Sequence, residues 1–480
     1  MNVHVDRPSL REYQVADLAF YLMNKKCMNL SDPGVGKTPS VVVYLWYLWN
    51  ELGVGSAWVM PKRLLDKNRR EILRFTEFRE EDVVILDGTA KQIQQQLNSG
   101  AKVFLMGFRR WALSWKNLPR FVKAVPVDEF HKGFKSPNSQ ATLALFESFD
   151  TGRMEYFLPM TGTLVSGKLT SAYPAIRIIE PRYYSGPEAF EYQHAIKDYD
   201  GKIIGWQNHQ KLAAILGTHA IRRTFESVHG RQDPVIIPEV VKMSDRQRGM
   251  YDEFHDKAIL DLERFYLDGT EPGVAFIRAR QLMEHPNKFP DLTNPGQFID
   301  ALPGEVPGKL ELLDIHLDDH ENTGKPLIIY TSMIPQQMQV ADLLRKRGFR
   351  TGIINGRLSI KESDRVAKDF EDGKLDVMLS SEECADVGFN WQHVGDQELD
   401  HIIFMTMGYL DTTFLQAVRR AIRGKRASPL RVSVFEYEDS IDQHVFGIVY
   451  KKSVDANKVD PTRPILQLSG AEKDYSIREF

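Results

Sequence analysis

Residues 31–38 read Ser-Asp-Pro-Gly-Val-Gly-Lys-Thr, a short segment of small, flexible and phosphate-binding residue types. Backbone N–H groups of a glycine-rich turn before a helix can surround a polyphosphate. In such a turn Lys37 would reach the β- and γ-phosphates, and the Thr38 hydroxyl would bind Mg²⁺. Ser31 replaces the usual first glycine, so a glycine-rich turn with an incidental lysine is the alternative. The apolar residues on both sides favour the phosphate loop.

Two adjacent carboxylates follow an apolar run at residues 125–127. A strand that ends in acids delivers them to the carboxyl edge of a parallel sheet, where ligands bind. Asp128 would hold Mg²⁺, which takes one or two protein carboxylates and keeps several waters. Glu129 would orient and deprotonate an attacking water. For this pair alone, an acidic strand end that faces solvent is an equal alternative.

A third segment, residues 416–423, reads Gln-Ala-Val-Arg-Arg-Ala-Ile-Arg. Arg420 and Arg423 are three positions apart, so a helix would place them on one face. Phosphoryl transfer builds charge on the γ-phosphate oxygens, and a guanidinium from a second domain can stabilise it. Taken alone, an arginine-rich surface helix is the simpler interpretation. The three segments together, in this order and at these separations, are hard to obtain by chance.

These segments resemble the helicases and translocases of superfamily two, nearest the Swi/Snf-like branch and its compact phage-type members. The resemblance covers residues 10–445. Residues 10–14 (Leu-Arg-Glu-Tyr-Gln) are similar to the adenine-recognising segment ahead of the phosphate loop. Residues 128–131 (Asp-Glu-Phe-His) resemble the Asp-Glu-Ala-His box, with phenylalanine in place of alanine. Residues 160–163 (Met-Thr-Gly-Thr) resemble the motif that senses the ATP state.

The second half continues the resemblance. Residues 327–330 look like the opening strand of a second motor domain. Ser381 with residues 387–390 occupies the place of motif five, and residues 416–423 that of motif six. Ala385-Asp386 stand where the family often has two glycines, which leaves the backbone of motif five open.

The resemblance implies roles for groups of residues. The expected catalytic residues are Lys37, Asp128, Glu129, Gln416, Arg420 and Arg423. The expected ATP-binding residues are Arg11, Gln14, Asp32, Pro33, Gly34, Val35, Gly36, Lys37, Thr38 and Gly388, and the Mg²⁺ ligands are Thr38 and Asp128. The residues expected to couple ATP state to movement are His131, Thr161, Gly162 and Thr163. For His131, a hydrogen-bonded structural histidine is the alternative.

A stripe of basic residues is the expected nucleic-acid contact, because phosphate contacts grip a strand without reading its sequence. In the first half it contains Lys62, Arg63, Arg109, Arg110, Lys132 and Lys135, with Arg222 and Arg223 further along. In the second half the resemblance adds Gly356, Arg365, Ser381 and Asn390. A lysine in a loop is usually just solvated, so the set carries more weight than any member.

Composition agrees with a large globular protein. A chain of 480 residues is too long for one core and predicts two or three domains. The net charge of −3 does not exclude nucleic acid, because a local basic stripe suffices. Two cysteines form neither a disulfide framework nor a zinc site. Without a secretory signal or an apolar run of about 20 residues, we expect no membrane segment, no structural metal and an intracellular, cytoplasmic protein, in the host cytoplasm if viral.

Apolar runs alternate with helical patterns in both halves, which predicts an α/β fold with parallel sheets. The expected strands are 57–60, 83–86, 103–106, 125–127 and 156–160, then 327–330, 351–354, 377–380, 401–405 and 432–437. We therefore expect two RecA-like parallel-sheet motor domains in tandem with a helical insertion between them. The expected divisions are an ATP-binding domain at 1–238, a helical insertion and linker at 239–308, a second helicase domain at 309–452 and a tail at 453–480.

The function implied by the resemblance is that of an ATP-dependent DNA helicase or translocase. It would use ATP and Mg²⁺, be stimulated by DNA, and act on duplex, branched or single-stranded DNA. The compact chain favours remodelling of forks or junctions by analogy. One alternative is a duplex translocase that displaces bound proteins without separating strands. Another is a nucleotide-dependent DNA clamp with a slow ATPase.

Overall fold

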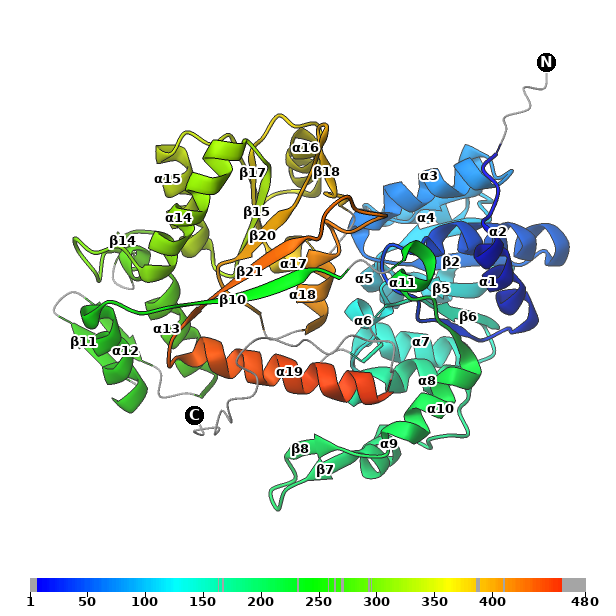
Figure 1. Cartoon of the computed structure of the whole chain (residues 1–480). Helices are drawn as coiled ribbons and strands as arrows, with labels where there is room; N and C mark the ends of the chain where they lie inside the picture. The colour runs from blue at the N-terminus through cyan, green and yellow to red at the C-terminus, as the bar shows by residue number, and fades with distance from the viewer. Residues whose placement is uncertain are drawn as a thin grey trace. The chain divides into compact units, whose positions relative to one another are not determined.

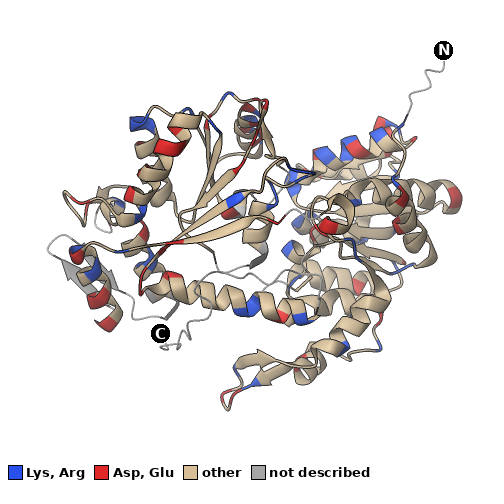
Figure 2. Cartoon of the chain, in the orientation of Figure 1, with Lys and Arg blue, Asp and Glu red and all other residues tan. Residues whose placement is uncertain are grey.

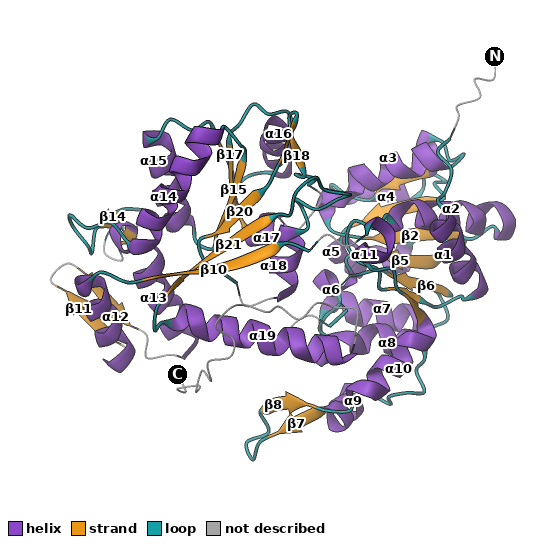
Figure 3. Cartoon of the chain, viewed as in Figure 1, coloured by secondary structure: helices purple, strands orange, loops and turns teal. Residues whose placement is uncertain are grey.

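The structure is a computed structural model. It describes residues 7–162, 164–165, 168–230, 233–257, 259–262, 265–268, 272–291, 294, 296–385, 389–408 and 411–459. Of these, 7–230 and 455–459 belong to one compact unit and 233–454 to a second (Figure 1). Each unit contains a parallel sheet with helices around it (Figure 3). The two expected parallel-sheet domains are therefore confirmed.

The sheet of the first unit has five parallel strands in the order β3-β4-β2-β5-β6. They are β2 (Gly55–Val59), β3 (Val83–Ile85), β4 (Val103–Met106), β5 (Val122–Val127) and β6 (Tyr156–Pro159). Every residue of β2 and β4 is buried, as expected for parallel strands covered on both faces. These strands confirm the five expected in the first half.

Helices and short strands complete the first unit. The helices are α1 (Glu12–Met23), α2 (Lys37–Leu52), α3 (Leu65–Phe75), α4 (Ala90–Leu97), α5 (Phe108–Ser114), α6 (Phe130–Gly133), α7 (Gln140–Asp150), α8 (Tyr173–Ile179), α9 (Pro187–His194), α10 (His209–His219) and α11 (Phe225–His229). The short strands are β1 (Met28–Asn29), β7 (Ala195–Lys197), β8 (Ile203–Trp206) and β9 (Ala220–Ile221). β1 pairs in parallel with β9, and β7 with β8 forms an antiparallel hairpin.

The sheet of the second unit has six parallel strands in the order β10-β21-β20-β15-β17-β16. They are β10 (Val235–Val241), β15 (Leu327–Thr331), β16 (Thr351–Ile354), β17 (Val377–Ser381), β20 (His401–Phe404) and β21 (Arg431–Tyr437). Five of them were expected. The sixth, β10, is an edge strand with alternating partial burial and an internal Pro238, which only an edge strand tolerates.

The remaining elements of the second unit are helices and, among its described residues, three hairpins; the last of these helices ends in the first unit. The helices are α12 (Asp245–Lys257), α13 (Pro272–Glu284), α14 (Gly308–Thr323), α15 (Ile334–Lys346), α16 (Ile360–Glu371), α17 (Glu382–Ala385), α18 (Asp411–Val418) and α19 (Ile441–Val459). The hairpins are β11 (Ile259–Leu262) with β12 (Phe265–Asp268), β13 (Phe289–Pro290) with β14 (Phe298–Ile299), and β18 (His393–Val394) with β19 (Gln397–Glu398).

The expected divisions need correction at two places. A boundary at residue 238 falls inside β10, which pairs with β21 and so belongs to the second unit. The helical insertion expected at 239–308 also groups with the second unit, and a β-hairpin separates its helices α12 and α13. The tail continues α19 as far as Val459, and residues 460–480 lie outside the described residues.

A buried ionic group joins three helices of the second unit. The Lys309 ammonium lies 2.8 Å from a Glu284 carboxylate oxygen and 2.7 Å from one of Asp442. All three side chains are almost completely buried. Buried charges are tolerated only when they are paired, so this group fixes the packing of α13, α14 and α19.

Three histidines cluster where α14 packs on the second sheet. His320 Nε2 lies 2.9 Å from His401 Nδ1, and the His316 and His401 rings are 5.3 Å apart. His401 is also 2.9 Å from the Ser433 hydroxyl and from an Arg431 nitrogen. Burial, followed by the Arg431 charge, lowers the pKa of His401 to about 2, so its ring is neutral at physiological pH.

Among the described residues, no helix is long and apolar enough to span a membrane.

Candidate nucleotide-binding site

The glycine-rich turn has the geometry expected of a phosphate loop. It leaves β1 at Asn29 and enters the sixteen-residue α2 at Lys37. Gly34 and Gly36 have φ values of 86° and 76°, a left-handed backbone that glycine adopts without strain. Gly36 is also the N-cap of α2, so the first N–H groups of that helix face the turn.

Lys37 lies inside this loop. Its ammonium donates to the carbonyl oxygens of Ser31 at 2.7 Å and Asp32 at 3.0 Å. Burial lowers the pKa of Lys37, and the negative charges of Glu129 and Asp128 oppose that shift. The structure therefore brings the phosphate loop and the acidic pair together, although 91 residues separate Lys37 from Asp128 in sequence.

The acidic pair leaves the carboxyl end of β5, as the sequence predicts. The Asp128 N–H donates to the Val59 carbonyl oxygen at 2.8 Å, which continues the pairing of β5 with β2. Burial raises the pKa of Asp128 to about 6, and the adjacent charge of Glu129 adds to the shift. Glu129 has a φ of 47°, a left-handed backbone that few residues other than glycine adopt.

The donor set fits a hard divalent cation. Asp128 is partly buried beside Glu129, and a cation there would offset both the desolvation and the repulsion that raise its pKa. The Thr38 hydroxyl, in the first turn of α2, would supply a second oxygen. No group of three or more His, Cys, Asp and Glu side chains suited to a metal occurs in the described part of the chain. Mg²⁺ needs only one or two protein carboxylates, because it keeps waters and takes phosphate oxygens.

His131 connects the acidic pair to the residues after β6. Its Nδ1 lies 2.8 Å from the Thr161 hydroxyl and 3.6 Å from a Glu129 carboxylate oxygen. Gly162 packs directly on Pro33 of the phosphate loop, since a Cβ at 162 would lie 2.7 Å from the proline Cδ. Three of the four expected coupling residues are thus placed at the site. Thr163 lies outside the described residues.

The segment expected to recognise adenine contacts the phosphate loop itself. The Gln14 amide donates to the Gly36 carbonyl oxygen at 2.8 Å and accepts from the Arg11 N–H at 2.8 Å. The Tyr13 hydroxyl donates to the Val35 carbonyl oxygen at 2.7 Å. Base recognition by Gln14 and Arg11 stays a prediction, and their position beside the loop supports it.

Arg222, which we expected in the basic stripe, contacts the phosphate loop, and the side chain of Arg223 contacts α1. Arg222 donates to the Leu30 carbonyl oxygen at 2.9 Å and pairs with Asp32 at 3.4 Å. Arg223 Nε donates to the Asp17 carboxylate of α1 at 2.9 Å. Sequence patterns gave no signal for these contacts, because they depend on the pairing of β1 with β9 about 190 residues away.

The basic residues expected to contact nucleic acid in the first unit follow the carboxyl ends of the strands or the acidic pair. Lys62 pairs with Asp87 at 3.2 Å, and Arg110 donates to the Gly88 carbonyl oxygen at 3.3 Å. The remaining members are the exposed Arg109 and Lys135 and the partly buried Arg63 and Lys132. Lys and Arg alternate with Asp and Glu along α3, in keeping with the near-zero net charge (Figure 2).

In the second unit, the expected nucleic-acid residues lie at separate positions. Gly356, Arg365 and Asn390 are exposed, and Ser381 ends β17. Gly388, expected to bind nucleotide, lies outside the described residues.

The arginines of the third segment need a correction. α18 contains Gln416 but ends at Val418, so Arg420 lies in a turn and Arg423 in a bend, and the two do not share a helix face. The turn nevertheless brings their guanidinium groups together. Arg423 donates to the Phe389 carbonyl oxygen at 2.8 Å, and Arg420 lies 3.5 Å from the same oxygen. Arg420 is 6% exposed.

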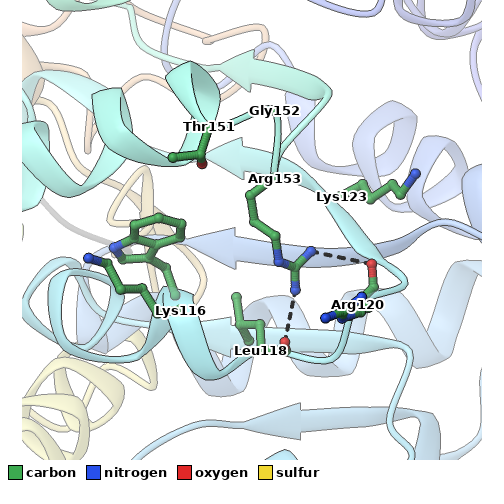
Figure 4. A pocket seen from close by; sticks show the side chains of 8 residues that line it. Lys116, Leu118, Arg120, Lys123, Thr151, Gly152 and Arg153 are labelled. Carbon is green, nitrogen blue, oxygen red and sulfur yellow. Dashed lines mark hydrogen bonds between the residues drawn. The ribbon is translucent and has the colours of Figure 1, made fainter.

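A hollow of about 530 Å³ lies at the amino-terminal ends of β5 and β6, the sheet edge opposite the phosphate loop (Figure 4). Three of its basic residues, Lys116, Lys123 and Arg153, already have partners. Arg153 donates to four carbonyl oxygens of residues 118–122, and Lys116 and Lys123 pair with Glu147 and Glu155. None of the expected site residues lines this hollow.

Two family models match the chain. The SNF2-related domain matches residues 14–288, and the Helicase conserved C-terminal domain matches residues 308–425. The first match alone covers more than half of the chain. This protein belongs to the SNF2-related family. It is thus a Swi/Snf-like member of superfamily two, with ATPase domains that resemble those of helicases.

No curated protein matches this SNF2-related chain. A solved structure, the SWI2/SNF2 ATPase core of Sulfolobus solfataricus in complex with dsDNA, is similar over 95% of this chain and 94% of that chain. The two share 16% sequence identity, with a TM-score of 0.41.

Proposed function

We propose that this SNF2-related ATPase couples ATP hydrolysis to movement on DNA and remodels branched DNA, such as forks or four-way junctions. The observation that carries the proposal lies within the first unit. There the charges of Asp128 and Glu129 act on Lys37 and oppose the lowering of its pKa by burial, and His131 links the pair to Thr161. A phosphate loop with two partly buried carboxylates beside it is suited to hydrolysis of a nucleoside triphosphate.

Residues of the first unit would have separate roles in binding and hydrolysing ATP. Lys37 and the N–H groups at the start of α2 bind the triphosphate. Thr38 and Asp128 hold Mg²⁺, which supplies charge neutralisation on the phosphate oxygens when it is bound. Glu129 orients the attacking water and accepts its proton. Arg11 and Gln14 bind the base.

The second unit would contribute the arginines. Arg420 and Arg423 converge on one carbonyl oxygen, so a small change in the turn reorients both guanidinium groups. We assign them to the charge that develops on the γ-phosphate, and Gln416 to the same step. Hydrolysis that depends on residues from both units is alternately enabled and halted as the units move, which converts turnover into stepping.

Basic residues that follow the strands of the first unit would grip the DNA backbone. Lys62 and Arg110 contact neighbouring loops, at Asp87 and Gly88. Surface ion pairs of this kind are weak, so a DNA phosphate can replace the acidic partner of Lys62. Contacts to phosphate grip without reading sequence, as a motor that moves along DNA requires.

The test is ATP turnover by the full chain with and without DNA, followed by strand displacement on forks, four-way junctions and plain duplexes. DNA should raise turnover, and junctions should be remodelled. A Lys37→Ala chain, which lacks the phosphate-binding ammonium, is the negative control. Turnover unchanged by any nucleic acid would reject the motor. Slow turnover at saturating DNA would identify a clamp, and stimulation without strand displacement would identify a duplex translocase.

A further inference from the structure

Residues 220–229, which we call the strap, are attached to the phosphate loop by their backbone. Ala220 and Ile221 pair with Met28 and Asn29 as β9 and β1. The pairing continues past both strands, since the Leu30 N–H donates to the Ile221 carbonyl oxygen and the Asp32 N–H to that of Arg223, both at 2.9 Å. The strap therefore holds the first residues of the loop in register.

Side chains reinforce this attachment at Asp32, which is 5% exposed. One carboxylate oxygen accepts from the Phe225 N–H at 2.9 Å, and the other pairs with Arg222 at 3.4 Å. Further along, His229 Nε2 lies 3.2 Å from the Gly34 carbonyl oxygen. Charge-assisted hydrogen bonds are the stronger ones, so Asp32 is the firmest point of the contact.

The strap acts on the same two residues that hold the essential lysine. Ser31 and Asp32 accept the Lys37 ammonium through their carbonyl oxygens. The Ser31 hydroxyl also accepts from the strap, through the Arg223 N–H at 2.9 Å. Hydrogen bonds weaken steeply with distance and misalignment, so a small displacement of the strap changes where Lys37 is held.

The strap also leads directly into the second unit. Gly230 is five residues before Val235, where β10 begins. β10 pairs with β21 of the second unit over its seven residues. Residues 231–234, which we call the tether, therefore connect the strap to the second unit in the sequence. The chain returns once more to the first unit, through α19.

We propose that Asp32 and Arg222 are positioning residues and that the strap transmits displacement of the second unit to the phosphate loop, which sets the rate of nucleotide release. This inference rests on the proposed motor function. Movement of the second unit displaces β10 and the tether. The bonds that Phe225 and Arg222 make with Asp32, which we call the clamp, pass that displacement to Ser31, Asp32 and the lysine that they hold.

The first experiment lengthens the tether and leaves the clamp intact. Gly-Ser-Gly-Ser is inserted after Gly230 in the full chain, and the same insert after Gly201, in the turn between β7 and β8, is the matched control. Release of a fluorescent ADP analogue is measured with and without duplex DNA. We expect the Gly230 insertion to keep the affinity measured without DNA and to lose the change in release rate that DNA produces. The control should behave as the unaltered chain.

The outcomes separate the inference from the function. If DNA alters ADP release equally in the Gly230 insertion and the control, coupling passes through α19 and the strap inference is wrong. If DNA affects neither release nor turnover in the unaltered chain, the motor is rejected together with the inference.

A second experiment tests the clamp. Arg222→Met should weaken binding of the ADP analogue about tenfold, which corresponds to about 1.4 kcal/mol. Arg222→Lys retains the charge and should recover part of that loss. Unchanged affinity in the methionine chain, with an unchanged unfolding temperature, would overturn the role of Arg222.

Discussion

Gly162 and Pro33 pack so closely that a Cβ on residue 162 would lie 2.7 Å from the proline Cδ. A proline ring cannot rotate away, so an added methyl group must move the backbone of the phosphate loop. The segment after β6 and the glycine-rich loop therefore share one fixed contact. His131 adds a second connection, because it bonds Thr161, the residue before Gly162.

The first prediction concerns this contact. Gly162→Ala should lower kcat/KM for ATP by roughly 10²-fold, because displacement of about 1 Å in a reacting group can have that effect. Steady-state ATPase assays check it. Gly217→Ala is the control, since Gly217 lies in α10, where an added methyl group would have no neighbouring atom within 4 Å, and should leave kcat/KM unchanged. Equal kinetics for both variants would contradict the packing argument.

The second prediction concerns Glu129. Glu129→Gln should bind ATP and slow hydrolysis by about 10²–10⁴-fold, because the amide cannot accept a proton from water. Nucleotide binding and phosphate release are measured separately. The control is Glu51→Gln, an exposed change near the end of α2. A Glu129→Gln chain that hydrolyses ATP at the normal rate would show that another group is the base.

The third prediction concerns Arg420. Arg420→Ala should retain ATP affinity and slow hydrolysis by about 10³-fold or more, the usual contribution of an arginine that acts on the γ-phosphate. Single-turnover hydrolysis checks it, with Arg419→Ala as the neighbouring control. Because Arg420 is buried, the unfolding temperature of the Arg420→Ala chain is measured as well. Rapid hydrolysis by a folded Arg420→Ala chain would remove this arginine from the mechanism.

The fourth prediction concerns the buried ionic group. Lys309→Met leaves the carboxylates of Glu284 and Asp442 buried without their cation. We expect a loss of about 3–5 kcal/mol in unfolding free energy, measured by urea denaturation. Lys368→Met, which breaks an exposed pair with Asp372, should change the unfolding free energy far less. Similar losses for the two variants would show that burial does not control the effect.

The fifth prediction concerns pH. The pKa of His401 is about 2 in the fold, below about 6.5 in an unfolded chain. Below pH 6.5 the unfolded state therefore binds more protons than the folded state. The contribution of His401 to stability is fully present above that pH and is lost as the pH decreases. The slope for His401 is about 1.4 kcal/mol per pH unit. Burial also lowers the pKa of His320, which adds to the slope.

Urea denaturation between pH 5 and 7.5 measures this slope. A His401→Gln chain, which has no titrating ring at this position, should show a smaller slope. An identical pH dependence in the two chains would mean that another group controls it.

The fold was largely predictable because buried parallel strands leave a strong sequence signal. Strands such as β4 and β15 are apolar at nearly every position, so composition alone locates them. β10 lacked that signal, since it lies at a sheet edge and is only partly buried. The hairpin β11–β12 was not predicted, because it lies within a charged segment whose pattern indicated a helical insertion.

The site was predictable where its chemistry is local in sequence. Lys37, Asp128 and Glu129 were found from short motifs, and the structure brings them together. The bracing of the loop by Arg222 and Arg223 was missed, because parallel pairing of β1 with β9 leaves no local pattern. The convergence of Arg420 and Arg423 was expected from a helix, yet a turn produces it.

The left-handed backbone at Glu129 limits how this carboxylate can be studied. Glycine there would relieve the local conformational strain and remove the acid at the same time, so a slow glycine variant could not separate catalysis from loop geometry. A β-branched replacement would add strain of its own. Glutamine has the same backbone strain as glutamate, which makes it the substitution that isolates the chemistry of the carboxylate.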